Sequence, residues 1–225
     1  IDNKHILSLK DLNLSKQIQS LIDIEVKSFK IEGRLKDINY VKNITAHYRL
    51  LIDNILQNKK EYSKASNGIV SINFNPDPDK TFNRGYTEYL INNNYNEKIN
   101  TELNTPKSIG QKVAIVTEIN NKYLKVNTLV DDLKNGDGIC FLNKNNEVNG
   151  FYINQINKNI IYSEITDKIN IGTILFRNHN ITFEKQLDNP KYATRKIPIT
   201  IEIKQIDNNV IFIASTQNNI KIQIE

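Results

Sequence analysis

The sequence predicts an α/β part followed by a mostly β part. In the first sixty residues, alternating apolar runs precede stretches with apolar residues at helical spacing, an order typical of βα units on a parallel sheet. From residue 113 onward, short β-type runs alternate with turns about every ten residues, which indicates a small antiparallel barrel or sandwich. We therefore expect the last βα units of a (β/α) TIM-like barrel, joined to a small antiparallel β-barrel or sandwich as an accessory domain.

The βα units are justified in chain order. A short apolar run at 5–10 predicts a strand, and apolar residues at helical spacing over 14–22 predict a helix. Aromatic and β-branched residues at alternate positions predict the next strand at 27–32. One long apolar stripe over 35–58 predicts a helix, with Asp37 suited to its positive end.

The β part is bounded by turn residues. Its expected strands are 113–119, 122–129, 139–142, 148–156, 159–165 and 173–177. Isoleucines alternate with polar residues over 197–205 and return at 210–214, which predicts a half-buried hairpin. The expected domains are 1–60 for the barrel units, 61–110 for a linker, 111–190 for the small β-barrel, and 191–225 for the hairpin as the start of a further β element.

Composition limits the classes of function. The chain has 225 residues, a net charge of +5 and a pI of about 9.0, but its lysines are scattered among nearly as many acids. This balance allows a nucleic-acid partner and favours solvated lysines over a dense RNA-binding surface. Cys140 is the single cysteine and lies in an apolar run, so we expect it to be buried, with no internal disulfide or multi-cysteine metal site.

The sequence also carries signals about the cellular location of the protein and about whether the chain is a part of a longer one. No apolar run approaches the roughly 20 residues of a membrane span, and nothing resembles a secretory signal. We expect a cytoplasmic protein with no membrane partner. The sequence contains no methionine and begins as if in mid-pattern, so we take it as a piece of a longer protein.

In the stretch SFKIEGRL at 28–35, charged residues occupy alternate positions of the expected strand and would share one of its faces. In a closed barrel, Lys30 and Glu32 would point inward near the C-terminal end of the strand, where (β/α) barrel enzymes place their chemistry, and Arg34 would lie beside the same mouth. Lys10 and Asp11 repeat this arrangement on the preceding strand. These residues form our predicted site. The alternative is a purely structural Lys30–Glu32 ion pair on an open sheet edge.

Longer strings resemble a known family. LSLKDLNL at 7–14 and SFKIEGRLKD at 28–37 resemble, in order and spacing, the end of the catalytic domain of peptidase family U32, the collagenase-like peptidases. Further strings resemble the linker and C-terminal β-domain of the longer, Bacteroidetes-type members: FNRGYTEYL at 82–90, TPKSIGQKV at 105–113, NGDGICF at 135–141, GTILFRNHNITFEKQL at 172–187 and RKIPI at 195–199.

The resemblance implies two activities. Members are described as proteases acting on collagen, so a peptide hydrolase is one expectation. Others hydroxylate a pyrimidine in ribosomal or transfer RNA and are thought to use an iron–sulfur cluster. In the family, the cysteine-rich signature with the proposed cluster ligands lies just before the string matched at 7–14. The resemblance therefore implies no cofactor within these residues, and a chain that is inactive alone.

Each candidate site residue has an expected role at the barrel mouth. Glu32 is the candidate general acid or base, and Arg34 suits a carboxylate or phosphate. Lys30, Lys10, Asp11 and Arg84 are the other candidates for binding substrate or cofactor, with Arg84 lying in the matched FNRGY string. Arg84 can equally fix its loop by pairing with Asp77 or Asp79. No residue is expected to bind a metal.

A third hypothesis is a binding module, in which the β part holds RNA or a protein partner. Phe176 with Arg177 and His179, and Tyr192 with Arg195 and Lys196, are the basic-aromatic surfaces that fit it. Two further motifs favour structural roles. Gly136-Asp137-Gly138 is typical of a turn, and a protease built on Ser8, Asp11 and His47 lacks a nucleophile elbow.

Overall fold

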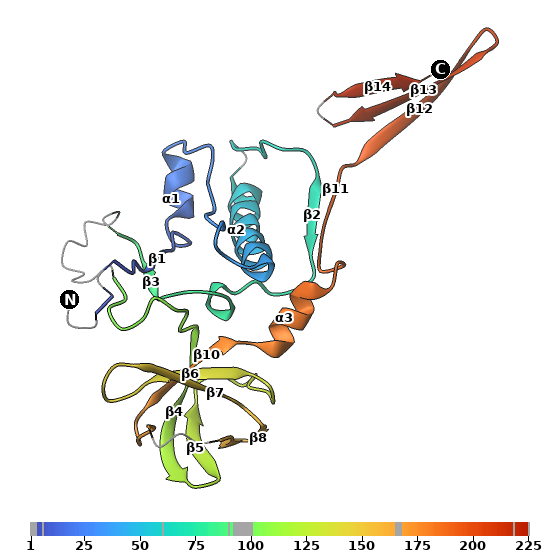
Figure 1. The fold of residues 1–225 in the computed structure, drawn as a ribbon. Coiled ribbons are helices and arrows are strands. Elements are labelled where there is room, and N and C mark those ends of the chain that lie inside the picture. Colours follow the sequence, from blue (N-terminus) through green and yellow to red (C-terminus); the bar gives the residue numbers. More distant parts are fainter. Residues whose placement is uncertain are drawn as a thin grey trace.

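The chain folds into a helical part, a curved β-sheet and a C-terminal sheet (Figure 1). The computed structural model describes residues 4–5, 7–59, 61–89, 91, 101–164, 168–217 and 219–224. Few helices and mostly antiparallel sheets confirm the coarse expectation of a mixed part followed by a mostly β part. Residues 92–100 of the linker predicted at 61–110 lie outside the described residues. So do residue 90, the last of the FNRGYTEYL string, and residue 165, the last of the strand predicted at 159–165.

The helical part contains α1 (Ile18–Asp23) and α2 (Ile38–Asn58). The predicted long helix is confirmed in α2. Its N-cap is Asp37, whose carboxylate accepts a hydrogen bond from the backbone N–H of Tyr40 at 2.7 Å, as the sequence led us to expect. On its inner face α2 buries Asn43, Ile44 and Ala46. No helix in the described part of the chain is both long and apolar enough to cross a membrane.

The strand predicted at 27–32 is wrong: residues 26–33 have no regular secondary structure. The strand predicted at 5–10 is displaced to β1 (Asp11–Leu12), which pairs in parallel with β3 (Tyr86–Thr87). Alternation predicts which residues share a face, but a strand also needs a neighbour to complete its hydrogen-bond ladder. Within the described residues, only the β1–β3 ladder is parallel, and a barrel is not seen.

Seven antiparallel strands form the central sheet, in the order β7-β6-β10-β4-β5-β9-β8. The strands are β4 (Gln111–Asn120), β5 (Tyr123–Thr128), β6 (Gly138–Leu142), β7 (Val148–Tyr152), β8 (Gln155–Asn157), β9 (Ile160–Tyr162) and β10 (Ile174–His179). Five of the six predicted runs each correspond to one strand, whereas the run predicted at 148–156 divides into β7 and β8. Register shifts in β4 and β10 bend the sheet around its apolar core. Cys140 is buried in β6, as expected.

Several elements were absent from the prediction. The helix α3 (Ile181–Asp188) follows β10 directly, with the Asn180 side chain accepting a hydrogen bond from the Phe183 N–H at 3.0 Å. The strand β2 (Ile69–Ile72), inside the predicted linker, pairs with β11 (Ala193–Lys196). A short 3₁₀ turn, η1 (Pro78–Lys80), follows β2. The helix α3 is tied to α2 because Lys42 Nζ donates to the Leu187 carbonyl at 2.7 Å.

The C-terminal sheet consists of β12 (Ile199–Ile206), β13 (Asn209–Thr216) and β14 (Lys221–Ile224). The predicted hairpin is confirmed in β12 and β13, but its burial is not. Ile199, Ile201 and Ile203 are 57%, 60% and 63% exposed. The alternation is present, while no described element packs on the apolar face; Figure 1 shows the sheet standing away from the rest of the chain.

Candidate functional site

A pocket of about 1080 Å³ lies between α1, the segment 26–36, α2 and the loop at 82–84. Its floor is apolar and comes from both helices and the turn before α1: Leu14, Ile18, Leu21, Ile44 and Ile52. Five of the six predicted site residues line it: Asp11, Lys30, Glu32, Arg34 and Arg84. The sixth, Lys10, is outside the lining and lies beside Gly85, where an added Cβ would be 3.9 Å from Lys10 Cε.

Asp11 and Arg84 form the main ion pair of this pocket. Arg84 donates from NH2 to Asp11 Oδ1 at 3.0 Å and from Nε to Oδ2 at 3.4 Å, and its backbone N–H donates to Oδ2 at 2.8 Å. The two side chains are only 25% and 17% exposed. The expectation that Arg84 pairs with Asp77 or Asp79 is therefore wrong. The parallel β1–β3 ladder places Asp11 beside the loop of Arg84.

Lys36 completes a cationic and aromatic cluster. Its ammonium lies 3.1 Å from the centre of the Phe82 ring, 5.5 Å from that of Tyr40 and 3.9 Å from Asp11 Oδ1. Burial lowers the pKa of Lys36, an effect that the Asp11 carboxylate opposes and the Arg84 guanidinium supports. Burial also raises the pKa of Tyr40, and Asp11 adds to the rise. Two cations and aromatic faces thus meet at one wall of the pocket.

Glu32, Lys30 and Arg34 lie at the exposed rim. Lys30 Nζ is 3.6 Å from Glu32 Oε2, and these side chains are 87% and 72% exposed. The Glu32 carboxylate also accepts a hydrogen bond from the Arg34 backbone N–H at 3.3 Å. The expected placement inside a barrel is not seen in the described residues. The alternative, an exposed ion pair, describes the geometry, although all three residues still line the pocket.

Ser15 and His47 form the one serine–histidine contact of the described chain, with Oγ and Nε2 2.8 Å apart. Asn13 Oδ1, which can only accept, lies 2.5 Å from Ser15 Oγ, so the hydroxyl donates to Asn13. In that arrangement Nε2 of His47 donates to Ser15 Oγ, and the contact fixes the turn before α1 against α2. Burial lowers the pKa of His47.

The residues that the structure describes do not fit a metal or an iron–sulfur cluster. Within the described ranges, no three of His, Cys, Asp and Glu lie close enough together to hold a metal ion. Cys140 donates its S–H to the Ile109 carbonyl at 3.3 Å, and burial raises the pKa of its thiol to about 11. A buried thiol is a poor metal ligand because ligation needs the thiolate.

Arg177 is not part of an RNA surface, contrary to the basic-aromatic expectation. Its side chain is 1% exposed and pairs with Asp137 at 3.1 Å and with Asp132 at 2.8 Å. It also donates to Gln111 Oε1 at 2.7 Å. Asp137 is fully buried and accepts from the Lys134 and Ile181 N–H groups. The Gly136-Asp137-Gly138 motif is therefore a structural turn, as predicted.

Lys36 and Phe82 are site residues that the sequence analysis did not single out. Both lie inside strings that carry the family resemblance, SFKIEGRLKD and FNRGYTEYL, and this is the signal that could have identified them. Their contact joins segments far apart in the chain, so periodicity within either segment gives no information on it.

Comparisons with known proteins agree with the resemblance. Residues 2–101 match Peptidase family U32. The chain is 42% identical over 155 residues to the 23S rRNA 5-hydroxycytidine C2501 synthase of Escherichia coli, covering 69% of the chain and 23% of that protein. It is 33% identical over 153 residues to an uncharacterized protease of Methanocaldococcus jannaschii, covering 64% and 34%.

A shorter match joins the same group. The chain is 40% identical over 58 residues to tRNA hydroxylation protein P2 of Bacillus subtilis, covering 26% of the chain and 19% of that protein. The chain thus spans about a quarter to a third of the first two relatives. No solved structure matches.

Proposed function

Residues 2–101 of this chain belong to peptidase family U32, and we propose that the protein of which they are part hydroxylates a pyrimidine of ribosomal or transfer RNA. The observation that carries this proposal is the pocket wall where Lys36, Arg84 and Phe82 meet above an apolar floor. The name of the relative with 42% identity, an rRNA 5-hydroxycytidine synthase, supports the same activity.

Such a wall suits a nucleotide for physical reasons. Flat bases stack on aromatic rings and on guanidinium planes, and single-stranded nucleotides are recognised largely in this way. Arginine and lysine bind phosphate or carboxylate oxygens. We assign Arg84 and Arg34 to binding anionic groups of the substrate. Lys30 and Lys10 would add positive charge that attracts the same groups, and Glu32 would transfer a proton at the rim of the pocket. Asp11 positions Arg84 through its paired hydrogen bonds.

The finer architecture belongs to the same proposal. Residues 1–60 would be the last βα units of a TIM-like barrel, 61–110 a linker and 111–190 the accessory domain. The parallel β1–β3 pair at the pocket supports this assignment. A cytoplasmic location goes with an RNA substrate. An iron–sulfur cluster, implied by the family resemblance, would need ligands from other parts of a longer protein, because the described residues do not fit one.

Peptide hydrolysis is the second candidate, favoured by the match to a protein named as a protease. The geometry gives it less support. Neither Ser15 nor His47 lines the pocket, and the Ser15 hydroxyl is hydrogen-bonded to Asn13 Oδ1 at 2.5 Å. A module that only binds RNA or protein is the candidate from a different class, and it would require no chemistry at the pocket.

The test is nucleoside mass spectrometry on ribosomal and transfer RNA from cells that lack the full-length gene. We expect one hydroxylated pyrimidine to disappear, to return with the wild-type gene, and to stay absent with Glu32→Gln or Arg84→Met. Glu61→Gln, a change of the same kind at an exposed loop residue outside the pocket, should restore it. An unchanged RNA profile in the deletion strain would refute the proposal and return attention to peptidase assays.

A further inference from the structure

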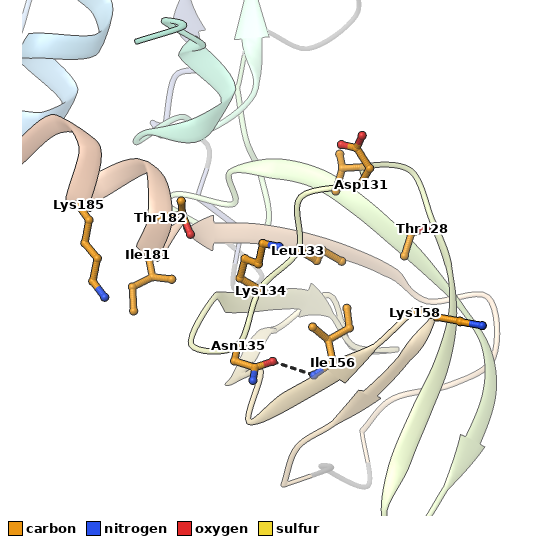
Figure 2. A pocket seen from close by; sticks show the side chains of 11 residues that line it. Thr128, Asp131, Leu133, Lys134, Asn135, Ile156, Lys158, Ile181, Thr182 and Lys185 are labelled. Atoms are coloured by element: carbon orange, nitrogen blue, oxygen red, sulfur yellow. Dashed lines mark hydrogen bonds between the residues drawn. The ribbon is translucent and has the colours of Figure 1, made fainter. Parts of the chain in front are cut away.

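The β part carries a second hollow of about 600 Å³, bounded by three elements (Figure 2). One wall is the loop 130–136 and another is the hairpin of β8 and β9. Helix α3 closes the third side with Ile181, Thr182 and Lys185, as Figure 2 shows. None of these residues lines the pocket between α1 and α2.

Hydrogen bonds hold these three walls in place. The Ile156 N–H donates to Asn135 Oδ1 at 2.9 Å, the bond drawn in Figure 2, which joins the loop to the hairpin. The Ile181 N–H donates to the buried Asp137 carboxylate at 3.1 Å, which joins α3 to the same loop. Gly136, with φ of +89°, leaves room for Ile181, whose Cδ1 lies 3.1 Å from where a Cβ would stand. The hollow is thus formed before any ligand arrives.

The charges around the hollow are mostly positive. Lys134, Lys158 and Lys185 come from the loop, the hairpin and α3, and all three are exposed. None of the three ammonium groups is in a hydrogen bond or ion pair with any described residue. Among the described residues that line the hollow, Asp131 alone is acidic. Lys80, close by in the fold, is instead neutralised by Asp132 at 3.0 Å.

We propose that this hollow binds the sugar–phosphate backbone of RNA, as a docking surface separate from the pocket that holds the target base. Unpaired cations on three sides suit phosphates, and the apolar side chains of Leu133, Ile156 and Ile181 in the lining suit a ribose or base lying between them. The lysines of the hollow by themselves indicate an anionic polymer, and the inference rests on the proposed function only for the identification of that polymer as RNA.

The helix α3 explains why such a surface would serve the pocket. Its residues Ile181, Thr182 and Lys185 form one wall of the hollow, and the Leu187 carbonyl near its end accepts a hydrogen bond from Lys42 of α2. Helix α2 in turn supplies Ile44 and Ile52 to the pocket floor. RNA held at the hollow would therefore stand in a fixed relation to the pocket.

Fluorescence anisotropy of a labelled short single-stranded RNA with the 225-residue chain tests this, over a series of salt concentrations. The variant Lys134→Gln/Lys158→Gln/Lys185→Gln should weaken binding by about tenfold to 100-fold at 0.1 M salt and lower the salt slope by about 2, since each phosphate contact on a single strand contributes about 0.7. The matched control Lys112→Gln/Lys122→Gln/Lys144→Gln removes the same charge from exposed positions of the same sheet and should keep the slope.

Equal losses in the two triple variants, with both folded by circular dichroism, would overturn the proposal and leave only diffuse charge attraction. Failure of the wild-type chain to bind RNA at low salt would also overturn it, as would binding of an acidic peptide in place of RNA. None of these three results would bear on the function proposed for the pocket between α1 and α2, because nucleoside mass spectrometry tests that function separately.

Discussion

Replacing Asp11 by asparagine tests whether the Asp11–Arg84 pair holds the pocket together. The substitution keeps the size of the side chain and leaves an oxygen for the Arg84 backbone N–H. It removes the negative charge that Arg84 contacts through NH2 and Nε, and that Lys36 faces at 3.9 Å. Two largely buried cations would then lie in the same pocket wall without a counter-charge.

The expected loss of stability follows from this geometry. A hydrogen bond to a charged group contributes about 1.5–3 kcal/mol, while an exposed ion pair contributes about 0–1 kcal/mol. Asp11 and Arg84 are mostly but not fully buried, and Asn keeps one contact, so we expect a loss of about 2 kcal/mol in the free energy of unfolding. For a chain of this length that is a drop of about 4–8 °C in Tm.

Urea and thermal unfolding, followed by circular dichroism, would measure this loss. Glu32→Gln makes the same kind of change at the exposed Lys30–Glu32 pair and should stay within about 0.5 kcal/mol of wild type. A double-mutant cycle with Arg84→Met should give a coupling energy of about 1–2 kcal/mol. A coupling near zero, or equal effects of the two carboxylate substitutions, would show that the pair does not stabilise the pocket.

Three further predictions concern other parts of the chain. Gly110 and Gly172 both have a left-handed φ, but a Cβ at Gly110 would lie 2.1 Å from the Arg177 carbonyl oxygen while one at Gly172 would meet nothing within 4 Å. Gly110→Ala should therefore unfold the β part, and Gly172→Ala should cost only about 1–2 kcal/mol in urea unfolding; similar costs would contradict the contact argument. Arg177→Met leaves the buried Asp137 carboxylate unpaired and should cost about 3–5 kcal/mol in the same assay, whereas a loss under about 1 kcal/mol would mean that the pair is not buried in solution. Because burial lowers the pKa of His47 below its ordinary 6.5 in the folded state, the unfolded chain binds more protons there, so stability should fall as the pH is lowered through about 6.5. His47→Gln should flatten that part of the curve of urea midpoint against pH, and an unchanged curve would rule out this source.

The sequence determined the features that depend on local patterns. The long helix over Ile38–Asn58 and its Asp37 cap follow from helical spacing and from a carboxylate placed before the first turn. The central strands follow from β-branched runs separated by glycine and asparagine turns. The strings around Lys30–Arg34 and Arg84 also pointed, through family resemblance, to residues that line one pocket.

The tertiary structure decided what each pattern contacts. SFKIEGRL alternates like a strand, but a strand requires a hydrogen-bonded neighbour, and residues 26–33 pair with none in the described chain. The isoleucines of β12 alternate as if half buried, yet burial depends on an opposing surface. Arg84 pairs with Asp11, and not with the nearer Asp77 or Asp79, because the β1–β3 ladder brings residues 73 positions apart into contact. Periodicity carries information over a few residues, whereas contacts between distant segments are set by the packing of the whole chain.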